Sequence, residues 1–257
     1  EPESEHASMS ILRGASAAGA RTFTATAAQG LMFMYEACIN VATMRLPVVM
    51  VIVCRELTAP HGVTCGEQDA ISAREAGWIQ IHTESCQEIL DSIIMAYRLA
   101  ESPDILVPVT ICYDGYFLSH LWEQVYIPSI EAVQRFLPPL EMAPVVDPQS
   151  PMIISPFLPP GGGTEYRYKH SAALERAKIR YETIDKEFQE AFNRSYGGTI
   201  EQYKCEDAEI VLITMGSCTG TARTVIDQKR DEGVKAGLIK VRMYRPFPKE
   251  RLLDALK

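Results

Sequence analysis

A continuous apolar run, Val-Val-Met-Val-Ile-Val-Cys, occupies residues 48–54 and ends at Arg55. A strand of this composition must be buried on both faces, which is typical of the centre of a parallel sheet between layers of helices. A shorter strand is expected at residues 21–25, followed by a mostly apolar helix over 29–43. The carboxyl ends of such strands meet at the edge where open α/β sheets bind ligands. These two strand ends therefore predict one side of a cofactor site.

Strands and helices alternate through the first half of the chain. The elements expected next are a helix over 69–76, a strand over 78–82, a helix over 84–100 capped by Thr83, and a strand over 105–113. This alternation predicts a doubly wound α/β sheet.

Proline and glycine dominate residues 137–163, which we expect to be an extended connection. A charged helix over 171–193 precedes a second α/β unit, in which two strands flank a helix. We therefore divide the chain into a first domain (1–136), a connection with its helix (137–200) and a second domain (201–257). The chain lacks an initiator Met and ends inside an expected helix, so we expect both domains to be incomplete.

The composition argues against several classes of function. The 257 residues carry a formal net charge of −8, which is unfavourable for binding nucleic acid. The longest apolar run is about as long as a strand and too short to span a membrane, and the chain starts without a signal-like segment. The seven cysteines occur singly, without the spacing of zinc or iron–sulfur sites. We expect a cytoplasmic protein with reduced thiols and no metal ligands of its own.

Single residues leave their roles open. Glu5 lies at the start of a small-residue helix, where an exposed acid at the helix start is the favoured interpretation. The TFTATAAQG segment, which contains Thr26 and Gln29, could bind an anion or a polar ring edge, or its hydroxyls could bind their own backbone. Gly216-x-x-x-Gly220 is similar to a phosphate-binding loop but lacks its lysine, so a simple turn is favoured.

Arg55 needs a negatively charged partner because an unpaired guanidinium at the end of a buried strand is costly. Glu56, Asp69 or an anionic ligand could supply it. Since arginine binds carboxylates with a two-pronged fork, a carboxylate substrate is one possibility. From the residues alone, a structural salt bridge is the favoured interpretation.

Together, several segments resemble one known family. They are SEHASMS, GARTFTATAAQGL, LPVVMVIVCRELTAP, EQDAISAREAGWIQI, DILVPVTICYDGYFLSH and KVRMYRPFP. In this order they resemble the alpha subunit of the 2-oxoacid:ferredoxin oxidoreductases, thiamine diphosphate enzymes such as pyruvate:ferredoxin oxidoreductase. The resemblance implies a pyrimidine-binding thiamine diphosphate domain followed by an α/β domain similar to the transketolase C-terminal domain.

The resemblance also implies an activity and its partners. Such enzymes oxidatively decarboxylate a 2-oxoacid to an acyl-CoA and CO2 and pass electrons through iron–sulfur clusters to ferredoxin or another acceptor. A beta subunit holds the diphosphate, Mg²⁺ and a share of the clusters, a ferredoxin-like delta subunit holds the others, and a gamma subunit is associated with coenzyme A. The alternatives are another thiamine diphosphate enzyme, of transketolase or 2-oxoacid dehydrogenase type, or a non-catalytic scaffold subunit.

The resemblance assigns site residues as well. Glu5 matches the acid that hydrogen-bonds the aminopyrimidine ring and shifts it toward its imino tautomer, and burial would favour the protonated carboxyl. Thr26 and Gln29 are expected beside the cofactor. Arg55 matches an arginine that pairs with the substrate carboxylate or with coenzyme A. Asp69 is expected to contact the substrate.

Two departures from the family leave the substrate open. The Tyr-Pro-Ile-Thr-Pro segment of the family, whose threonine faces the substrate, is not in this chain. The loop before Asp69 reads Gly-Glu-Gln where the family usually has Asp-His-x. Room at Gly62 and Gly66 would suit a bulkier or aromatic acid such as phenylglyoxylate, as well as pyruvate.

Overall fold

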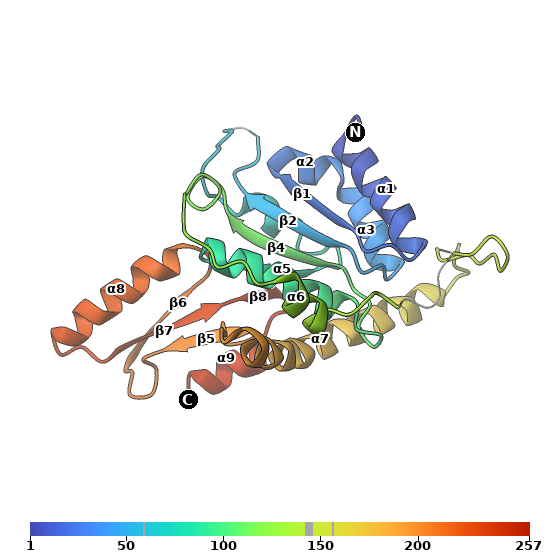
Figure 1. The fold of residues 1–257 in the computed structure, drawn as a ribbon. Coiled ribbons are helices and arrows are strands. Elements are labelled where there is room, and N and C mark those ends of the chain that lie inside the picture. The colour runs from blue at the N-terminus through green and yellow to red at the C-terminus, as the bar shows by residue number, and fades with distance from the viewer. Residues whose placement is uncertain (59, 142–145, 156) are drawn as a thin grey trace.

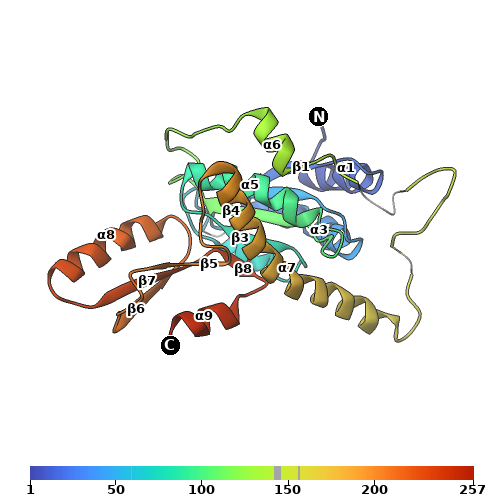
Figure 2. The ribbon, with the colours of Figure 1, turned by 60° about the horizontal axis from the view of Figure 1, so that its bottom comes forward.

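The computed structural model describes residues 1–58, 60–141, 146–155 and 157–257. The larger sheet has the strand order β1-β2-β4-β3-β8 (Figures 1 and 2). Its strands are β1 (Phe23–Ala27), β2 (Val49–Cys54), β3 (Ile79–His82), β4 (Val109–Asp114) and β8 (Met243–Arg245). The first four are parallel, and β8 is antiparallel to β3. The carboxyl ends of β1, β2 and β4 therefore lie together at one edge.

Helices cover both faces of this sheet. One face carries α1 (Glu5–Ala17), α2 (Ala28–Phe33), α3 (Tyr35–Thr43) and α4 (Gln68–Ser72); the other carries α5 (Cys86–Ala100), α6 (Ile130–Phe136) and α7 (Gly162–Phe192). Val49 and Val51 of β2 pack with α5 and α7, whereas Met50 and Ile52 pack with α1 to α3. The expectation of a strand buried on both faces is confirmed.

The smaller sheet has the order β5-β7-β6. Its elements are β5 (Ile200–Tyr203), β6 (Ile210–Thr214), β7 (Ala236–Val241) and the helix α8 (Cys218–Asp231), with α9 (Lys249–Ala255) beyond. β6 is parallel to β7 and β5 is antiparallel to it. Because β8 follows β7 after a single residue, Arg242, the chain passes directly from this sheet into the larger one (Figure 1).

Several expected boundaries were wrong. The helix expected over 29–43 is two helices, which meet at Met34. The cap of α5 is Ser85, whose Oγ accepts the Glu88 N–H at 3.2 Å, and not Thr83. The Thr83 hydroxyl instead donates to the Cys112 carbonyl of β4 at 3.2 Å. Thr83, which the local sequence favours as the cap, therefore bonds to β4 instead, and Ser85 caps the helix.

The connection before α7 also differs from the expectation. α7 begins at Gly162, nine residues before the predicted start at 171, and its first turns extend beyond the sheet (Figure 2). Residues 142–145 and 156 of the expected connection lie outside the described residues. β5 and α6 were not predicted, because each is short and carries no clear apolar period. Within the described ranges no helix is both long and apolar enough to cross a membrane.

Candidate active site

Asp69 joins the ends of β1 and β2. Its Oδ2 accepts the backbone N–H of Ala28 at 2.8 Å and that of Arg55 at 3.1 Å, and its Oδ1 accepts the N–H of Ala70 at 2.8 Å. The side chain is fully buried, and burial raises its pKa against the opposing effect of these three N–H donors. Asp69 therefore binds backbone, in contrast to the substrate contact expected from the resemblance.

Ala28 and Glu67 both have backbone geometry that non-glycine residues seldom adopt. Ala28 has a φ of 45°, and Glu67, just before α4, has a φ of 51°. Such left-handed residues are costly and persist where surrounding contacts hold them, often at functional sites. Here the Asp69 carboxylate holds the turn from β1 into α2 at Ala28.

Glu5 approaches the same strand end from α1. Its helix is capped by Ser4, whose Oγ accepts the Ala7 N–H at 3.2 Å. A Cβ placed on Gly30 would lie 2.9 Å from Glu5 Oε1 and 2.8 Å from Thr26 Oγ1. Glycine at this position therefore lets the Glu5 carboxylate lie against α2 beside the Thr26 hydroxyl.

The Glu5 carboxylate is free to bind another molecule. The side chain is exposed in this chain, in contrast to the expected burial. It forms no hydrogen bond or ion pair with any residue that the structure describes. A partner surface or a ligand would have to shield it.

The Arg55 guanidinium has no partner among the described residues. Its stem packs against Gly115, where an added Cβ would lie 2.7 Å from Arg55 Cγ. Within the described part of the chain no carboxylate lies within 4 Å of the guanidinium, and the buried Nε has no hydrogen-bond acceptor. The structural salt bridge favoured from the residues alone is therefore not formed with Glu56 or Asp69.

Two hydrogen bonds hold described residues of the segment between Arg55 and α4. Gln29 Nε2 lies 2.9 Å from His61 Nδ1, and Gln68 Oε1 accepts the Leu57 N–H at 2.8 Å. Gln29 therefore holds this loop, a contact that the sequence did not predict.

The expected extra room beside two glycines of this loop is already occupied. The side chain of Glu56 lies 3.2 Å from the position of a Cβ on Gly62, and a Cβ on Gly66 would overlap it. The two glycines accommodate Glu56, so they provide no evidence for a bulkier substrate.

A cluster of buried titratable side chains lies near the carboxyl ends of β3 and β4. His82 faces Cys112 in the strand register, and its Nδ1 is 3.2 Å from Glu67 Oε2. Burial alone would raise the pKa of the Cys112 thiol, but Cys54 and His82 lower it to about 7. Burial likewise opposes the charged form of His82, yet Cys112 and Glu67 raise its pKa above the usual value. His82 and Cys54 end β3 and β2, whereas Cys112 lies two residues before the end of β4 and Glu67 precedes α4, so no local pattern in the sequence indicated this cluster.

Family models match almost the whole chain. The model of the pyruvate flavodoxin/ferredoxin oxidoreductase thiamine diphosphate-binding domain matches residues 1–186, and that of pyruvate:ferredoxin oxidoreductase core domain II matches residues 208–257.

Curated relatives agree with these matches. The PorA subunit of pyruvate synthase from Methanothermobacter thermautotrophicus is 46% identical over 99% of this chain and 66% of its own length. The alpha subunit of an NADH-dependent phenylglyoxylate dehydrogenase from Aromatoleum evansii is 38% identical over 100% of this chain and 63% of its own length. The chain thus spans just under two thirds of the length of these relatives.

Solved structures confirm the predicted fold class. The 2-oxoglutarate:ferredoxin oxidoreductase of Magnetococcus marinus superposes with a TM-score of 0.71 at 18% identity, over 98% of this chain and 47% of that one. A transketolase of Pichia stipitis superposes with a TM-score of 0.51 at 13% identity, over 98% of this chain and 28% of that one. From the family models and the curated relatives, we conclude that this chain belongs to the pyruvate flavodoxin/ferredoxin oxidoreductase family.

Proposed function

We propose that this chain is the alpha-subunit part of a 2-oxoacid oxidoreductase that converts a 2-oxoacid to an acyl-CoA and CO2. The observation that carries this proposal is the pair of free charged groups at neighbouring strand ends. The Glu5 carboxylate lies at the end of β1, and the Arg55 guanidinium, which has no partner in the described ranges, follows β2. A site for a cofactor ring next to an anionic substrate needs these two groups.

The residues at the end of β1 fit the aminopyrimidine end of thiamine diphosphate. Glu5 offers a carboxyl group that, when protonated, would donate a hydrogen bond to a ring nitrogen, and Thr26 and Gly30 lie directly beside it. Thiamine diphosphate, when bound, supplies the electron sink for decarboxylation. The exposure of Glu5 supports a site shared with a second subunit. That beta subunit would hold the diphosphate and Mg²⁺.

Arg55 would bind the substrate. Its guanidinium can pair with the 2-oxoacid carboxylate through two parallel hydrogen bonds, and its buried Nε has no other acceptor among the described residues. Coenzyme A phosphate is the alternative partner. We assign Asp69 a positioning role, because it holds the Arg55 backbone while its own side chain is enclosed. We assign Gln29 a positioning role as well, because it holds the loop before α4 through its contact with His61.

Electron transfer would depend on other subunits. We propose that iron–sulfur clusters on beta and ferredoxin-like delta subunits take the electrons to ferredoxin or another acceptor, and that a gamma subunit binds coenzyme A. We also propose a cytoplasmic location, which the free state of all seven cysteines supports. The division at residues 1–136, 137–200 and 201–257 is retained as a proposal.

A turnover screen of the native complex tests the function. Pyruvate, 2-oxoglutarate, branched and aromatic 2-oxoacids and oxalate would each be supplied with coenzyme A and a low-potential electron acceptor. We expect coenzyme A-dependent reduction with pyruvate or with an aromatic acid such as phenylglyoxylate. Turnover that needs lipoamide and no clusters would favour a 2-oxoacid dehydrogenase, and a complex without thiamine diphosphate would favour a scaffold subunit.

A further inference from the structure

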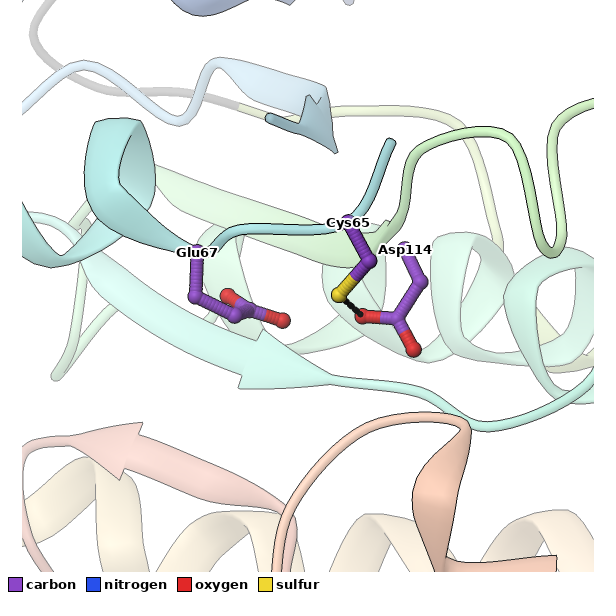
Figure 3. A group of neighbouring side chains, drawn as sticks. All are labelled: Cys65, Glu67 and Asp114. Atoms are coloured by element: carbon purple, nitrogen blue, oxygen red, sulfur yellow. Dashed lines mark hydrogen bonds between the residues drawn. The ribbon is translucent and has the colours of Figure 1, made fainter. Parts of the chain in front are cut away.

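Three potential metal ligands converge beside β4. The Cys65 thiol, the Glu67 carboxylate and the Asp114 carboxylate have ligand atoms that all lie within 4.8 Å of one another (Figure 3). Cys65 and Glu67 come from the loop before α4, and Asp114 is the last residue of β4. The Cys65 thiol donates to Asp114 Oδ1 at 3.1 Å. The three side chains are therefore already turned toward one point.

Buried His82 provides a second, independent indication of a ligand. Its side chain is fully buried, and neither ring nitrogen has a hydrogen-bond partner of acceptable geometry within the described structure. Its Nδ1 lies 3.2 Å from Glu67 Oε2, itself a buried oxygen without a hydrogen bond. Carboxylates that bind metals are themselves held by outer-shell partners, and His82 is placed to hold Glu67 in this way.

The cluster is accessible from a cavity. Cys65, Glu67 and Asp114 line a hollow of about 700 Å³ between the end of β4 and the start of α8. Asp114 Oδ2 accepts the Ser217 N–H at 2.7 Å, which leaves Oδ1 directed at Cys65. An ion can therefore enter from solvent, and its ligands would link the larger sheet to the turn before α8.

We propose that Cys65, Glu67 and Asp114 bind one divalent cation of the zinc class. A thiolate with two carboxylates suits zinc, which accepts sulfur and oxygen together, whereas Mg²⁺ and Ca²⁺ take oxygen ligands. Zinc–sulfur and zinc–oxygen bonds of about 2.3 and 2.1 Å place tetrahedral ligand atoms about 3.5 Å apart. The ligand atoms of the present cluster lie within 4.8 Å of one another, so small side-chain movements would bring them to that spacing.

The chemistry of binding is a simple exchange. The Cys65 thiol loses its proton to solvent and its hydrogen bond to Asp114 breaks. Bonds from the ion to Cys65, Glu67 and Asp114 then form as the hydrated ion releases the waters that these ligands displace. The fourth position faces the cavity and is filled by water. The ion would tie the loop just before α4, the helix that carries Asp69, to β4, so its role is to brace this loop beside the candidate active site. This differs from our expectation of no metal ligands, because the third ligand is far away in the sequence.

Metal content of the intact protein tests the proposal independently of activity. The full-length protein, with the subunits that copurify, is dialysed against a chelator and then equilibrated with zinc alone. Zinc is counted by mass spectrometry, and its ligands are read from X-ray absorption at the zinc edge, where iron–sulfur clusters do not contribute. We expect one more zinc per chain in the wild type than in Cys65→Ala, with one sulfur neighbour. Glu67→Gln should weaken binding by about tenfold or more.

Cys218→Ser is the matched control, because Cys218 lines the same cavity outside the cluster. It should bind zinc as the wild type does. Equal zinc in the wild type and Cys65→Ala, or loss of zinc in Cys218→Ser with retention in Cys65→Ala, would overturn the assignment. Thermal unfolding in chelator separates misfolding from lost binding, because metal-free Cys65→Ala should unfold close to the metal-free wild type.

Discussion

The carboxylate of Asp69 accepts the backbone N–H of Arg55 at 3.1 Å, yet the two side chains form no ion pair. The charge of Asp69 is thus directed to the backbone, and the guanidinium of Arg55 is left for a ligand. Since the same oxygen accepts the N–H of Ala28, one buried side chain sets the relative position of the two strand ends. Asp69 is therefore a positioning residue for the end of β1, where Glu5 lies, and for Arg55 after β2.

Asp69→Asn should therefore change substrate binding as well as stability. The amide keeps one acceptor oxygen but turns its NH2 toward a backbone donor, so one buried N–H loses its partner at a cost of about 1–3 kcal/mol. We expect the KM for the 2-oxoacid to rise more than kcat falls. Steady-state kinetics and thermal unfolding together check this. Asp104→Asn, at an exposed position, is the control. Lower stability with an unchanged KM would reduce Asp69 to a purely structural role.

Arg55→Lys should raise the KM for the 2-oxoacid by about tenfold or more, because an ammonium group cannot reproduce the two parallel hydrogen bonds of the guanidinium. Initial rates at varied 2-oxoacid and at varied coenzyme A separate the two possible ligands. Arg135→Lys on the exposed side of α6 should leave both constants unchanged. If only the KM for coenzyme A changes, Arg55 binds that substrate instead.

Gly30→Ala should weaken thiamine diphosphate binding although it favours the helix. Alanine stabilises a helix by about 1 kcal/mol over glycine, but here its Cβ would lie 2.9 Å from Glu5 Oε1 and displace the carboxylate. Loss of one hydrogen bond to a charged group, about 1.5–3 kcal/mol, corresponds to a roughly 10- to 100-fold weaker affinity. Titration of the cofactor-free complex with thiamine diphosphate measures this affinity.

The matched control for Gly30→Ala is Gly14→Ala in α1. Nothing lies within 4 Å of a Cβ at Gly14, so this change should stabilise the fold slightly and leave cofactor affinity unchanged. Equal affinity in Gly30→Ala and the wild type would mean that Glu5 does not contact the cofactor from its present position.

A structural feature could be predicted from the sequence when it depends on residues close together in the chain. The strand over 48–54 was predictable because its composition alone requires burial on both faces. The cap of α5 was not, because Thr83 and Ser85 are equivalent in the local sequence and only the contact with Cys112 distinguishes them. The strand therefore depends on its own composition, whereas the role of Thr83 depends on a contact with another strand.

The site shows the same limit. Residue chemistry alone favoured a salt bridge for Arg55 and a simple helix start for Glu5, and only the family resemblance selected them as site residues. That both are unpaired within the described chain is visible only in three dimensions. The bond from Asp114 to Ser217 joins residues 103 positions apart, which no local pattern indicates.

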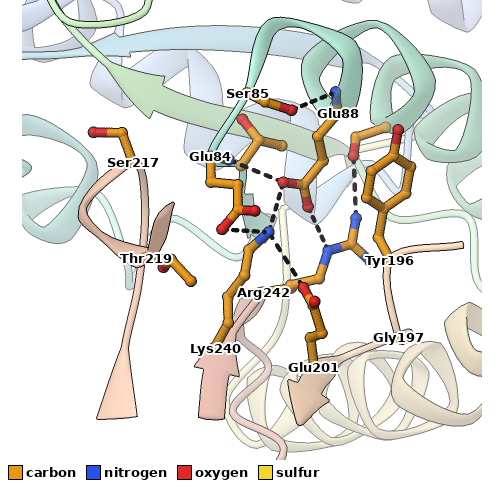
Figure 4. Close-up of polar contacts among 12 residues, drawn as sticks. Glu84, Ser85, Glu88, Tyr196, Gly197, Glu201, Ser217, Thr219, Lys240 and Arg242 are labelled. Carbon is orange, nitrogen blue, oxygen red and sulfur yellow. Dashed lines mark hydrogen bonds and ion pairs between the residues drawn. The ribbon is translucent and has the colours of Figure 1, made fainter. Parts of the chain in front are cut away.

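The two sheets are joined by a buried ionic network. Glu88 of α5 accepts hydrogen bonds from Lys240 Nζ and from Arg242 Nε, both at 2.6 Å (Figure 4). All three side chains are fully buried. Burial alone would raise the pKa of Glu88, but Arg242 and Lys240 outweigh it and hold that pKa below the usual value. Removing one partner of such a pair is costly because it leaves buried charge unpaired.

Glu88→Gln should therefore destabilise the chain by about 3–5 kcal/mol at pH 7. Because the pKa of Glu88 is lower in the folded than in the unfolded state, its stabilising contribution is complete above the ordinary glutamate pKa, and protonation removes it as pH falls through the folded value. The difference between the wild type and Glu88→Gln should be constant from pH 6 to 8 and shrink below about pH 4.5. Denaturant unfolding across this pH range measures the difference in the free energy of unfolding.

The control is Glu209→Gln, which breaks the exposed pair with Lys235 and should cost less than about 1 kcal/mol. A cost for Glu88→Gln that small, or one independent of pH, would show that the network does not hold the two sheets together.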